Sequence, residues 1–232
     1  MDASLLHELL FRSGDARCDA PALTCGTTSL TYGETGSRAR AFAAGMRVLG
    51  LPRGARVGIY LEKRFETVVA SFGAPAAGCV FVLLKAEQVS YIARDCQVQV
   101  IVTSPERAAL LATELRACED LRWLVLTERP TSDLSLPSHV QVVHWDDLLA
   151  GEARMGHRVI DSDVVAILYT SGSTGRPKGV VLSHRNMVGG AKSVASYLGN
   201  VSDDTLLAAL PLSFDAGFSQ LTTAFHVGAR GV

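Results

Sequence analysis

The sequence predicts an α/β fold with mostly parallel sheets flanked by helices, and three observations support this. Short apolar runs typical of buried strands alternate along the chain with longer segments of helical spacing. Loop-forming residues separate these segments. The composition is globular, since 48% of the 232 residues are hydrophobic and 19% are charged. Strict alternation of strand and helix favours parallel βαβ units, in which helices cover both faces of a sheet.

The helices follow from their spacing and their end signals. Residues 1–14 interrupt apolar positions with charged ones, which predicts an amphipathic helix and argues against a signal peptide. Residues 31–50 carry an apolar stripe that stops at Gly50. Pro75 should end or kink the helix that contains it, and Pro105 suits a first helical turn. Further helices are expected over residues 64–78, 85–96, 105–118, 146–150, 184–197 and 214–229.

The strands are short runs of apolar and β-branched residues. Two polar stretches, 128–139 and 151–163, are predicted to be loops. The second loop separates a first α/β subdomain, residues 1 to about 150, from the start of a second subdomain, about 160–232. The strands are expected over residues 55–61, 79–82, 98–104, 122–127, 140–145, 164–170 and 179–183, and from residue 205.

Charge and cysteine usage narrow the function classes. The net charge of −1 gives no indication of a nucleic-acid partner or of an anionic membrane. The five cysteines are widely spaced without a C-x-x-C pair, so neither a zinc site nor a disulfide framework is indicated. We therefore expect buried free thiols in a reducing cytoplasm, and we assign no metal ligands. No apolar stretch is long enough to predict a transmembrane helix.

The segment ILYTSGSTGRPKGVVLSH, residues 167–184, places small residues and one lysine between two predicted strands. Glycines let backbone N–H groups converge on an anion, and the hydroxyls of Ser171, Ser173 and Thr174 add donors. Lys178 adds a full charge on a flexible stem. These features predict a phosphate-binding loop, although the composition alone also fits a flexible Gly/Ser linker. The position of the lysine excludes a Walker A loop.

The stretch YTSGSTGRPKGVVLSH resembles the phosphate-binding signature of the adenylate-forming (AMP-binding) enzymes, which include acyl-CoA synthetases, peptide-synthetase adenylation domains and luciferases. LTYGET at residues 30–35 and LPLSFDAG at residues 210–217 are similar to further segments of that family. Among its subgroups, the chain is most similar to bacterial AMP-forming acyl-CoA ligases. The resemblance implies the acyl-CoA synthetase-like fold and an N-terminal part of the AMP-binding domain, without the C-terminal lid.

The resemblance also implies a reaction in two steps. A carboxylate attacks the α-phosphate of ATP, and the acyl group then passes from the adenylate to a thiol. The implied cofactors are ATP, Mg²⁺ and coenzyme A or the phosphopantetheine of a carrier protein. A small carboxylate is the implied substrate, while an acyl carrier protein and a second copy of the chain are open as partners. Lys178 and Thr174 are the implied catalytic residues, and the implied phosphate contacts are Thr170, Ser171, Gly172, Ser173, Thr174, Gly175 and Lys178.

The chain departs from the family pattern in two ways. It contains neither a YGxTE nor a TGD segment, which supply the family's Mg²⁺ and ribose contacts. We therefore expect an N-terminal piece that cannot complete adenylation alone. The family also has several more residues where Val82 and Leu83 follow each other here, so either a turn is deleted or a stretch of chain is missing at this point.

The LPLSFDAG segment is implied to open the acid pocket, with Phe214, Asp215 and Gly217 as substrate-binding residues. Asp215 stands where amino-acid-activating members bind the substrate's amino group, but an aspartate at the start of a helix more commonly caps its free N–H groups. Phe214 and Phe218 are four residues apart, which also fits two ordinary core side chains. The substrate is therefore open between a simple acid and an amino acid.

Several polar residues are predicted to be structural. Ser183 should cap the helix that follows it, with Asn186 three residues on. His184 is expected to be a buried, hydrogen-bonded side chain, and residues 62–66 a solvated charged surface. Two functions of other classes also remain open. One is a regulatory nucleotide-binding module, and the other is a catalytically inactive interaction protein.

Overall fold

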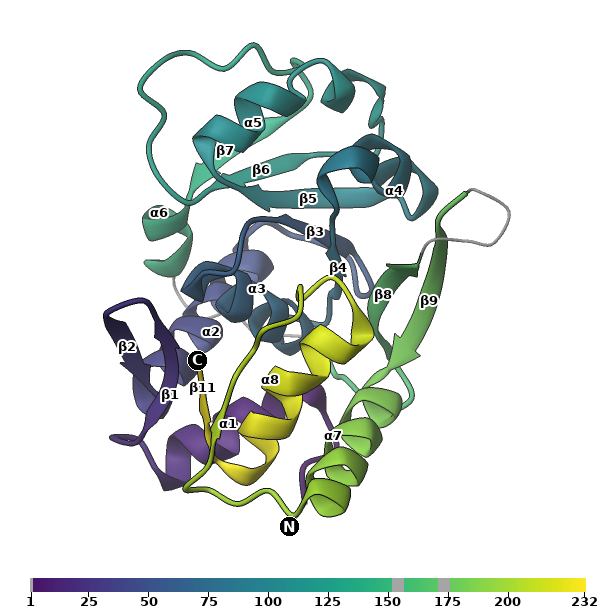
Figure 1. Cartoon of the computed structure of the whole chain (residues 1–232). Coiled ribbons are helices and arrows are strands. Elements are labelled where there is room, and N and C mark those ends of the chain that lie inside the picture. Colours follow the sequence, from purple (N-terminus) through teal and green to yellow (C-terminus); the bar gives the residue numbers. More distant parts are fainter. Residues whose placement is uncertain (1, 152–156, 171–175) are drawn as a thin grey trace.

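The structure is a computed structural model and describes residues 2–151, 157–170 and 176–232 (Figure 1). Within these residues the strands form a 7-stranded sheet, in the order β7-β6-β5-β3-β4-β8-β9, and a 4-stranded sheet, in the order β10-β11-β1-β2. The strands are β1 (Pro21–Cys25), β2 (Thr28–Thr31), β3 (Arg56–Tyr60), β4 (Val80–Leu83), β5 (Val98–Thr103), β6 (Trp123–Leu126), β7 (Gln141–His144), β8 (Val164–Thr170), β9 (Lys178–Ser183), β10 (Thr205–Leu206) and β11 (Arg230–Gly231).

Helices cover both faces of the large sheet, as expected for parallel strands (Figure 1). The helices α4 and α5 lie on one face, and α1, α2, α3 and α8 lie on the other. The α-helices are α1 (Leu6–Ala16), α2 (Tyr32–Val48), α3 (Phe65–Ala76), α4 (Val89–Asp95), α5 (Pro105–Leu111), α6 (Trp145–Leu149), α7 (His184–Leu198) and α8 (Asp215–Val227); η1 (Ala86–Gln88) and η2 (Glu114–Ala117) are 3₁₀-helices.

Alternation along the central strands builds two cores. On β3, Val57 and Ile59 join the core beneath α2, α3 and α8, while Tyr60 joins the core beneath α4 and α5. The first core contains a cluster of aromatic rings, in which Phe218 lies 4.9 Å from Phe81 between ring centroids. The predicted α/β class with mostly parallel strands is therefore confirmed, and its central strands are buried on both faces.

Three features of the topology were not predicted. The β8–β9 pair is antiparallel, with Thr170 opposite Lys178, so the strand after the glycine-rich segment returns as a hairpin. The β1–β2 hairpin precedes α2 and was not predicted from the sequence. In the small sheet β11 lies between β10 and β1 and pairs in parallel with both, with Leu23 opposite Gly231. The proposed division near residue 150 stays a prediction, although β8 extends the same sheet as β4.

The end signals explain where several helices begin or stop. The hydroxyls of Thr31 and Ser183 accept hydrogen bonds from the third residue of α2 and of α7, which confirms the predicted cap at Ser183. Pro105 is the first residue of α5, and α3 ends one residue after Pro75. The helices expected over 85–96 and 105–118 are each divided into a short 3₁₀-helix and a short α-helix.

The departure noted between Val82 and Leu83 falls inside strand β4. Its register against β3 is continuous from Arg56 opposite Val80 to Ile59 opposite Leu83. The two residues are therefore consecutive members of one strand in the structure, and the two alternatives, a deleted turn or a missing stretch of chain, both stay open.

Aromatic and polar contacts close the small sheet onto the helices. The Tyr32 hydroxyl, at the start of α2, donates to the carbonyl of Ala229 at 2.6 Å, across 197 residues of sequence.

Cys79, Cys96 and Cys118 are buried free thiols as predicted, but Cys18 and Cys25 are exposed. Across the described ranges, no helix combines the length and the apolar character needed to span a bilayer.

Candidate functional site

The candidate site lies where parallel strands of the large sheet end. Strands β3, β4 and β8 run in the same direction and end at Tyr60, Leu83 and Thr170. We call this the carboxyl edge. Ligands of open α/β sheets bind at such edges, because loops leave the strands there. The glycine-rich segment leaves the sheet at this edge, directly after Thr170.

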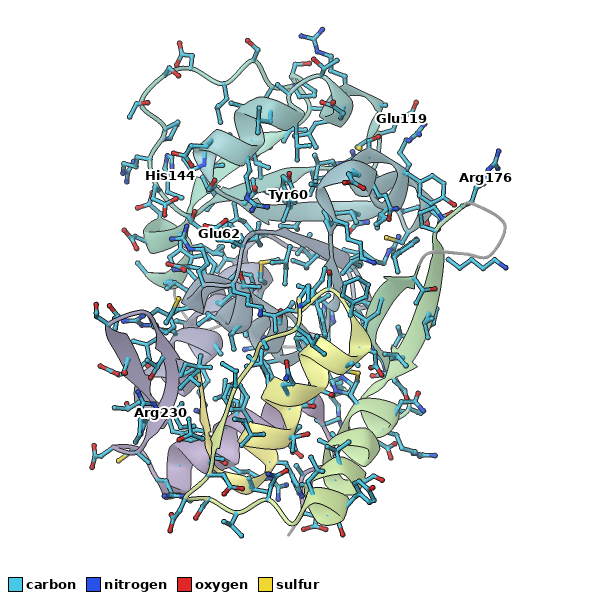
Figure 2. The ribbon with its side chains drawn as sticks, viewed as in Figure 1. Tyr60, Glu62, Glu119, His144, Arg176 and Arg230 are labelled. Carbon is cyan, nitrogen blue, oxygen red and sulfur yellow. The ribbon has the colours of Figure 1, made fainter. Side chains whose placement is uncertain are left out.

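The structure places two of the predicted phosphate-binding residues. Thr170 and Lys178 are exposed and stand opposite each other in the β8–β9 hairpin, where the Thr170 hydroxyl donates to the Lys178 carbonyl at 3.5 Å. Arg176 extends outward just before the start of β9 (Figure 2). The other five, which include the predicted catalytic Thr174, lie outside the described residues: Ser171, Gly172, Ser173, Thr174 and Gly175.

The hairpin is held from one side by residues that the sequence analysis did not single out. Tyr91 of α4 donates its hydroxyl proton to the Pro177 carbonyl at 3.3 Å. The Tyr169 hydroxyl donates to the Asp95 carboxylate at 2.5 Å, and burial followed by this hydrogen bond raises the pKa of Tyr169. Lys85, just before η1, donates to the Tyr169 carbonyl at 2.8 Å. Both arms of the hairpin are therefore attached to the segment between β4 and β5.

The LPLSFDAG segment approaches the same edge from the start of α8. A Cβ atom on Gly217 would stand 2.0 Å from the Pro211 carbonyl oxygen, so only glycine allows this close approach. Gln220 fixes the segment further, since its amide donates to the Leu207 carbonyl at 2.8 Å and accepts from the Leu210 amide at 3.3 Å. Backbone packing and one side chain thus set the position of this segment.

Phe214 and Phe218 have different environments. Phe218 is fully buried, which confirms its predicted core role. Phe214 is 46% exposed, and the Lys85 ammonium lies over its ring, with the nitrogen 4.2 Å from the ring centroid. The expected core role of Phe214 is therefore wrong. Asp215 is the first residue of α8 and is exposed, and in the described part of the chain no side-chain hydrogen bond caps this helix. Its expected capping bond is absent, although a carboxylate in the first turn still favours the helix dipole.

A cavity of 200 Å³ separates the strand ends from this segment. Leu61, Leu83 and Leu84 line one side, and Pro211, Leu212 and Ser213 line the other. Glu62 and Lys63 provide its charged rim. The cavity therefore combines apolar walls with a few polar groups, as small-molecule sites do.

The charged residues near β3 form an ion-pair network on a surface where Glu62 and Lys63 are exposed, as the predicted solvated surface requires. Arg64 pairs with Glu66 at 2.7 Å, with Glu128 at 2.6 Å and with Glu62 at 3.5 Å. Arg107 adds a contact to Glu62 at 3.1 Å (Figure 2 labels Glu62 beside Tyr60). The hydrogen bonds and charges of Glu66 and Glu128 raise the pKa of Arg64 against its desolvation. The charge of the Arg64 guanidinium is therefore balanced by the carboxylates around it.

His184 belongs to the opposite end of the hairpin. It is 1% exposed, and its Nδ1 accepts a hydrogen bond from the Leu6 backbone N–H at 2.9 Å. The His7 ring lies edge-on at 5.8 Å between centroids. Burial lowers the pKa of each histidine to about 4, so both are neutral near pH 7. The prediction of a buried, hydrogen-bonded His184 is confirmed. Among the described residues, no three His, Cys, Asp or Glu side chains gather in a way that could hold a metal ion.

Comparison with known proteins identifies the family. The model of the AMP-binding enzyme family matches residues 10–232. The chain belongs to the AMP-binding enzymes. The resemblance inferred from the phosphate-binding signature is thereby confirmed, and the family activates acids through adenylates.

Two relatives and one solved structure illustrate the range of this family. The chain is 32% identical over 214 residues to an L-proline--[L-prolyl-carrier protein] ligase of Streptomyces coelicolor, covering 88% of this chain and 39% of that protein. It is 32% identical over 210 residues to a peroxisomal long chain acyl-CoA synthetase 6 of Arabidopsis thaliana, covering 85% of this chain and 30% of that protein. The structure of VinN with 3-methylaspartate superposes with a TM-score of 0.80 at 28% identity, covering 98% of this chain and 61% of that one. The chain thus spans well under half the length of these two relatives.

Proposed function

We propose that the chain supplies ATP-binding residues to an enzyme that activates a carboxylic acid as its adenylate and then forms a thioester in the manner of an AMP-forming acyl-CoA ligase. The observation that carries the proposal is the convergence at the carboxyl edge of the hairpin bearing Thr170 and Lys178 with the segment bearing Phe214 and Asp215. A nucleotide loop and an acid-binding segment must meet for a carboxylate to reach an α-phosphate. Membership of the AMP-binding family supports the same reaction.

The proposed roles follow from the chemistry of each residue. Lys178 and Thr174 would hold the leaving phosphates, and the hydroxyls and backbone amides of residues 170–175 would contact the β- and γ-phosphates. Mg²⁺ would enter with the ATP phosphates. Coenzyme A or a carrier's phosphopantetheine would accept the acyl group, and relatives of both kinds support keeping the two acceptors open. Free cysteines are consistent with a reducing compartment.

A second candidate, amino-acid activation for a carrier protein, is favoured by Asp215. This carboxylate is exposed at the start of α8, and no ion pair in the described ranges involves it. It could therefore accept a substrate ammonium group. The prolyl-carrier relative and the 3-methylaspartate complex of VinN concern amino acids, which supports this alternative.

Calorimetric titration with ATP tests the proposal. Lys178→Ala should weaken ATP binding by roughly 10- to 150-fold, since a charge-assisted phosphate contact contributes roughly 1.5–3 kcal/mol. Lys192→Ala removes the same charge from α7 and should leave the affinity unchanged. Equal ATP affinity of the unmodified chain, Lys178→Ala and Lys192→Ala would exclude Lys178 from the site. Titration of the Asp215→Asn variant with L-amino acids separates the two substrate classes, because only amino-acid recognition needs that carboxylate.

A further inference from the structure

Lys85 reaches the carboxyl edge because β4 continues without a break to its end. The backbone N–H of Leu84 still donates to the Ile59 carbonyl of the neighbouring strand at 2.9 Å. Lys85 is the next residue and immediately precedes η1. The short connection after β4 therefore places an ammonium group directly at the edge where β8 also ends.

Both recorded contacts of the Lys85 ammonium are with neutral groups. One N–H donates to the Tyr169 carbonyl at 2.8 Å, and the Phe214 ring lies 4.2 Å away. An ammonium carries three N–H donors, so these two contacts leave a donor available. No ion pair found in residues 2–151, 157–170 and 176–232 includes Lys85. Partial burial lowers the pKa of Lys85, and among the described residues no carboxylate opposes that effect.

The two contacts join the two segments that meet at the site. Tyr169 immediately precedes Thr170 in β8, and Phe214 immediately precedes Asp215 in α8. A half-buried cation with only neutral partners is stabilised when an anion comes within hydrogen-bond distance. A purely structural role for Lys85, in holding β8 in place, would explain the hydrogen bond to Tyr169. A neutral donor could make the same hydrogen bond without the cost of desolvating a charge. Thr170, which the sequence analysis assigns to the phosphates, directly follows the Tyr169 carbonyl that Lys85 contacts.

We propose that Lys85 is an additional anion-binding residue of the carboxyl edge and that its ligand is a phosphate group of the bound nucleotide. The Tyr169 carbonyl and the Phe214 ring hold the ammonium in place, and its remaining N–H groups contact the phosphate. This inference rests on the proposed function, because it requires a nucleotide at this edge. It adds a second lysine to Lys178, from a different part of the chain.

The test is calorimetric titration of the 232-residue chain with magnesium-free pyrophosphate and, separately, with AMP. Lys85→Met removes the charge and keeps an unbranched side chain of similar length. Lys192→Met is the matched control, because it removes one lysine charge from α7, where Lys192 pairs with Asp2 and not with the carboxyl edge. We expect Lys85→Met to lower the affinity for one of the two ligands about tenfold and Lys192→Met to change neither affinity. Lys85→Arg should keep most of the affinity of the unmodified chain. Loss for pyrophosphate assigns the contact to the leaving phosphates, and loss for AMP assigns it to the α-phosphate.

Hydrogen exchange of the β8 and β9 amides, measured on the same variants, separates binding from support. Unchanged affinity of Lys85→Met for both ligands would overturn the inference, and faster exchange in that variant would then show that Lys85 only supports the hairpin. If the unmodified chain and Lys192→Met bind neither ligand nor ATP, the proposed function fails, and this inference fails with it. If the unmodified chain binds and Lys85→Met binds equally well, only the role of Lys85 is lost.

Discussion

Strands β3 and β9 belong to one sheet but are held in place by different forces. The last four residues of β3 are buried between two layers of helices. The first four residues of β9 are exposed, and Val181 alone is 58% accessible. Burial of apolar area fixes β3, whereas backbone pairing with β8 and a few polar contacts fix β9. The candidate site therefore rests on a small number of hydrogen bonds beside a rigid core.

The largest expected effect contrasts two phenylalanines of the same segment. Phe218→Ala should lower the free energy of unfolding by about 3–5 kcal/mol, because it leaves a cavity between Phe72 and Phe81. Phe214→Ala should lower it by less than about 1 kcal/mol, since it loses mainly the exposed contact with Lys85. Urea denaturation of both variants measures the difference. Equal losses would show that the edge is packed as firmly as the core.

The second prediction concerns the point where β9 enters the core. His7 and His184 have folded pKa values of about 4, below their ordinary value of 6.5, so the folded chain binds fewer protons than the unfolded chain between these values. Their contribution is complete above about pH 6.5 and is lost as the pH falls toward 4, on the order of 2 kcal/mol for each side chain. Urea unfolding at pH 7 and pH 4.5 checks this.

A matched pair of variants isolates the histidine effect. His184→Gln keeps an acceptor for the Leu6 amide but cannot become protonated, so its stability should vary less between the two pH values. His139 is exposed, and His139→Gln should keep the full pH dependence of the unmodified chain. The same pH dependence in both variants would place the acid sensitivity elsewhere in the molecule.

The smallest effect is expected at the hairpin itself. Tyr169→Phe removes the hydrogen bond to Asp95 and keeps the ring, which should loosen β9 by about 1 kcal/mol. Hydrogen exchange should become faster in β9 and stay unchanged in β3. Tyr197→Phe is the control, because that side chain is 87% exposed on α7. Faster exchange in β3 as well would mean that the two strands unfold as one unit.

The same contrast explains what the sequence could predict. The buried strands, the cap at Ser183 and the end of α3 at Pro75 depend on local patterns, and these predictions were confirmed. The small sheet was missed because β11 has 2 residues and gains its partners only through tertiary pairing. The signature residues located the phosphate segment in the sequence. Lys85, Tyr91 and Asp95 could not be found in this way, because they contact the β8–β9 hairpin across long separations in sequence. The sequence pattern departed from the family near these residues, between Val82 and Leu83, but it did not identify any of the three contacts.

The pairing of β1 with β11 has a consequence for the order of folding during synthesis. An isolated two-stranded hairpin is marginally stable in water, so β1 and β2 gain firm support only when Gly231 has been made. At about 5–20 residues per second, a ribosome needs on the order of ten seconds or more for the intervening chain. Throughout that interval one side of β1 presents unpaired backbone groups to its surroundings. During that interval newborn chains can associate with one another through this open edge, before its final partner emerges.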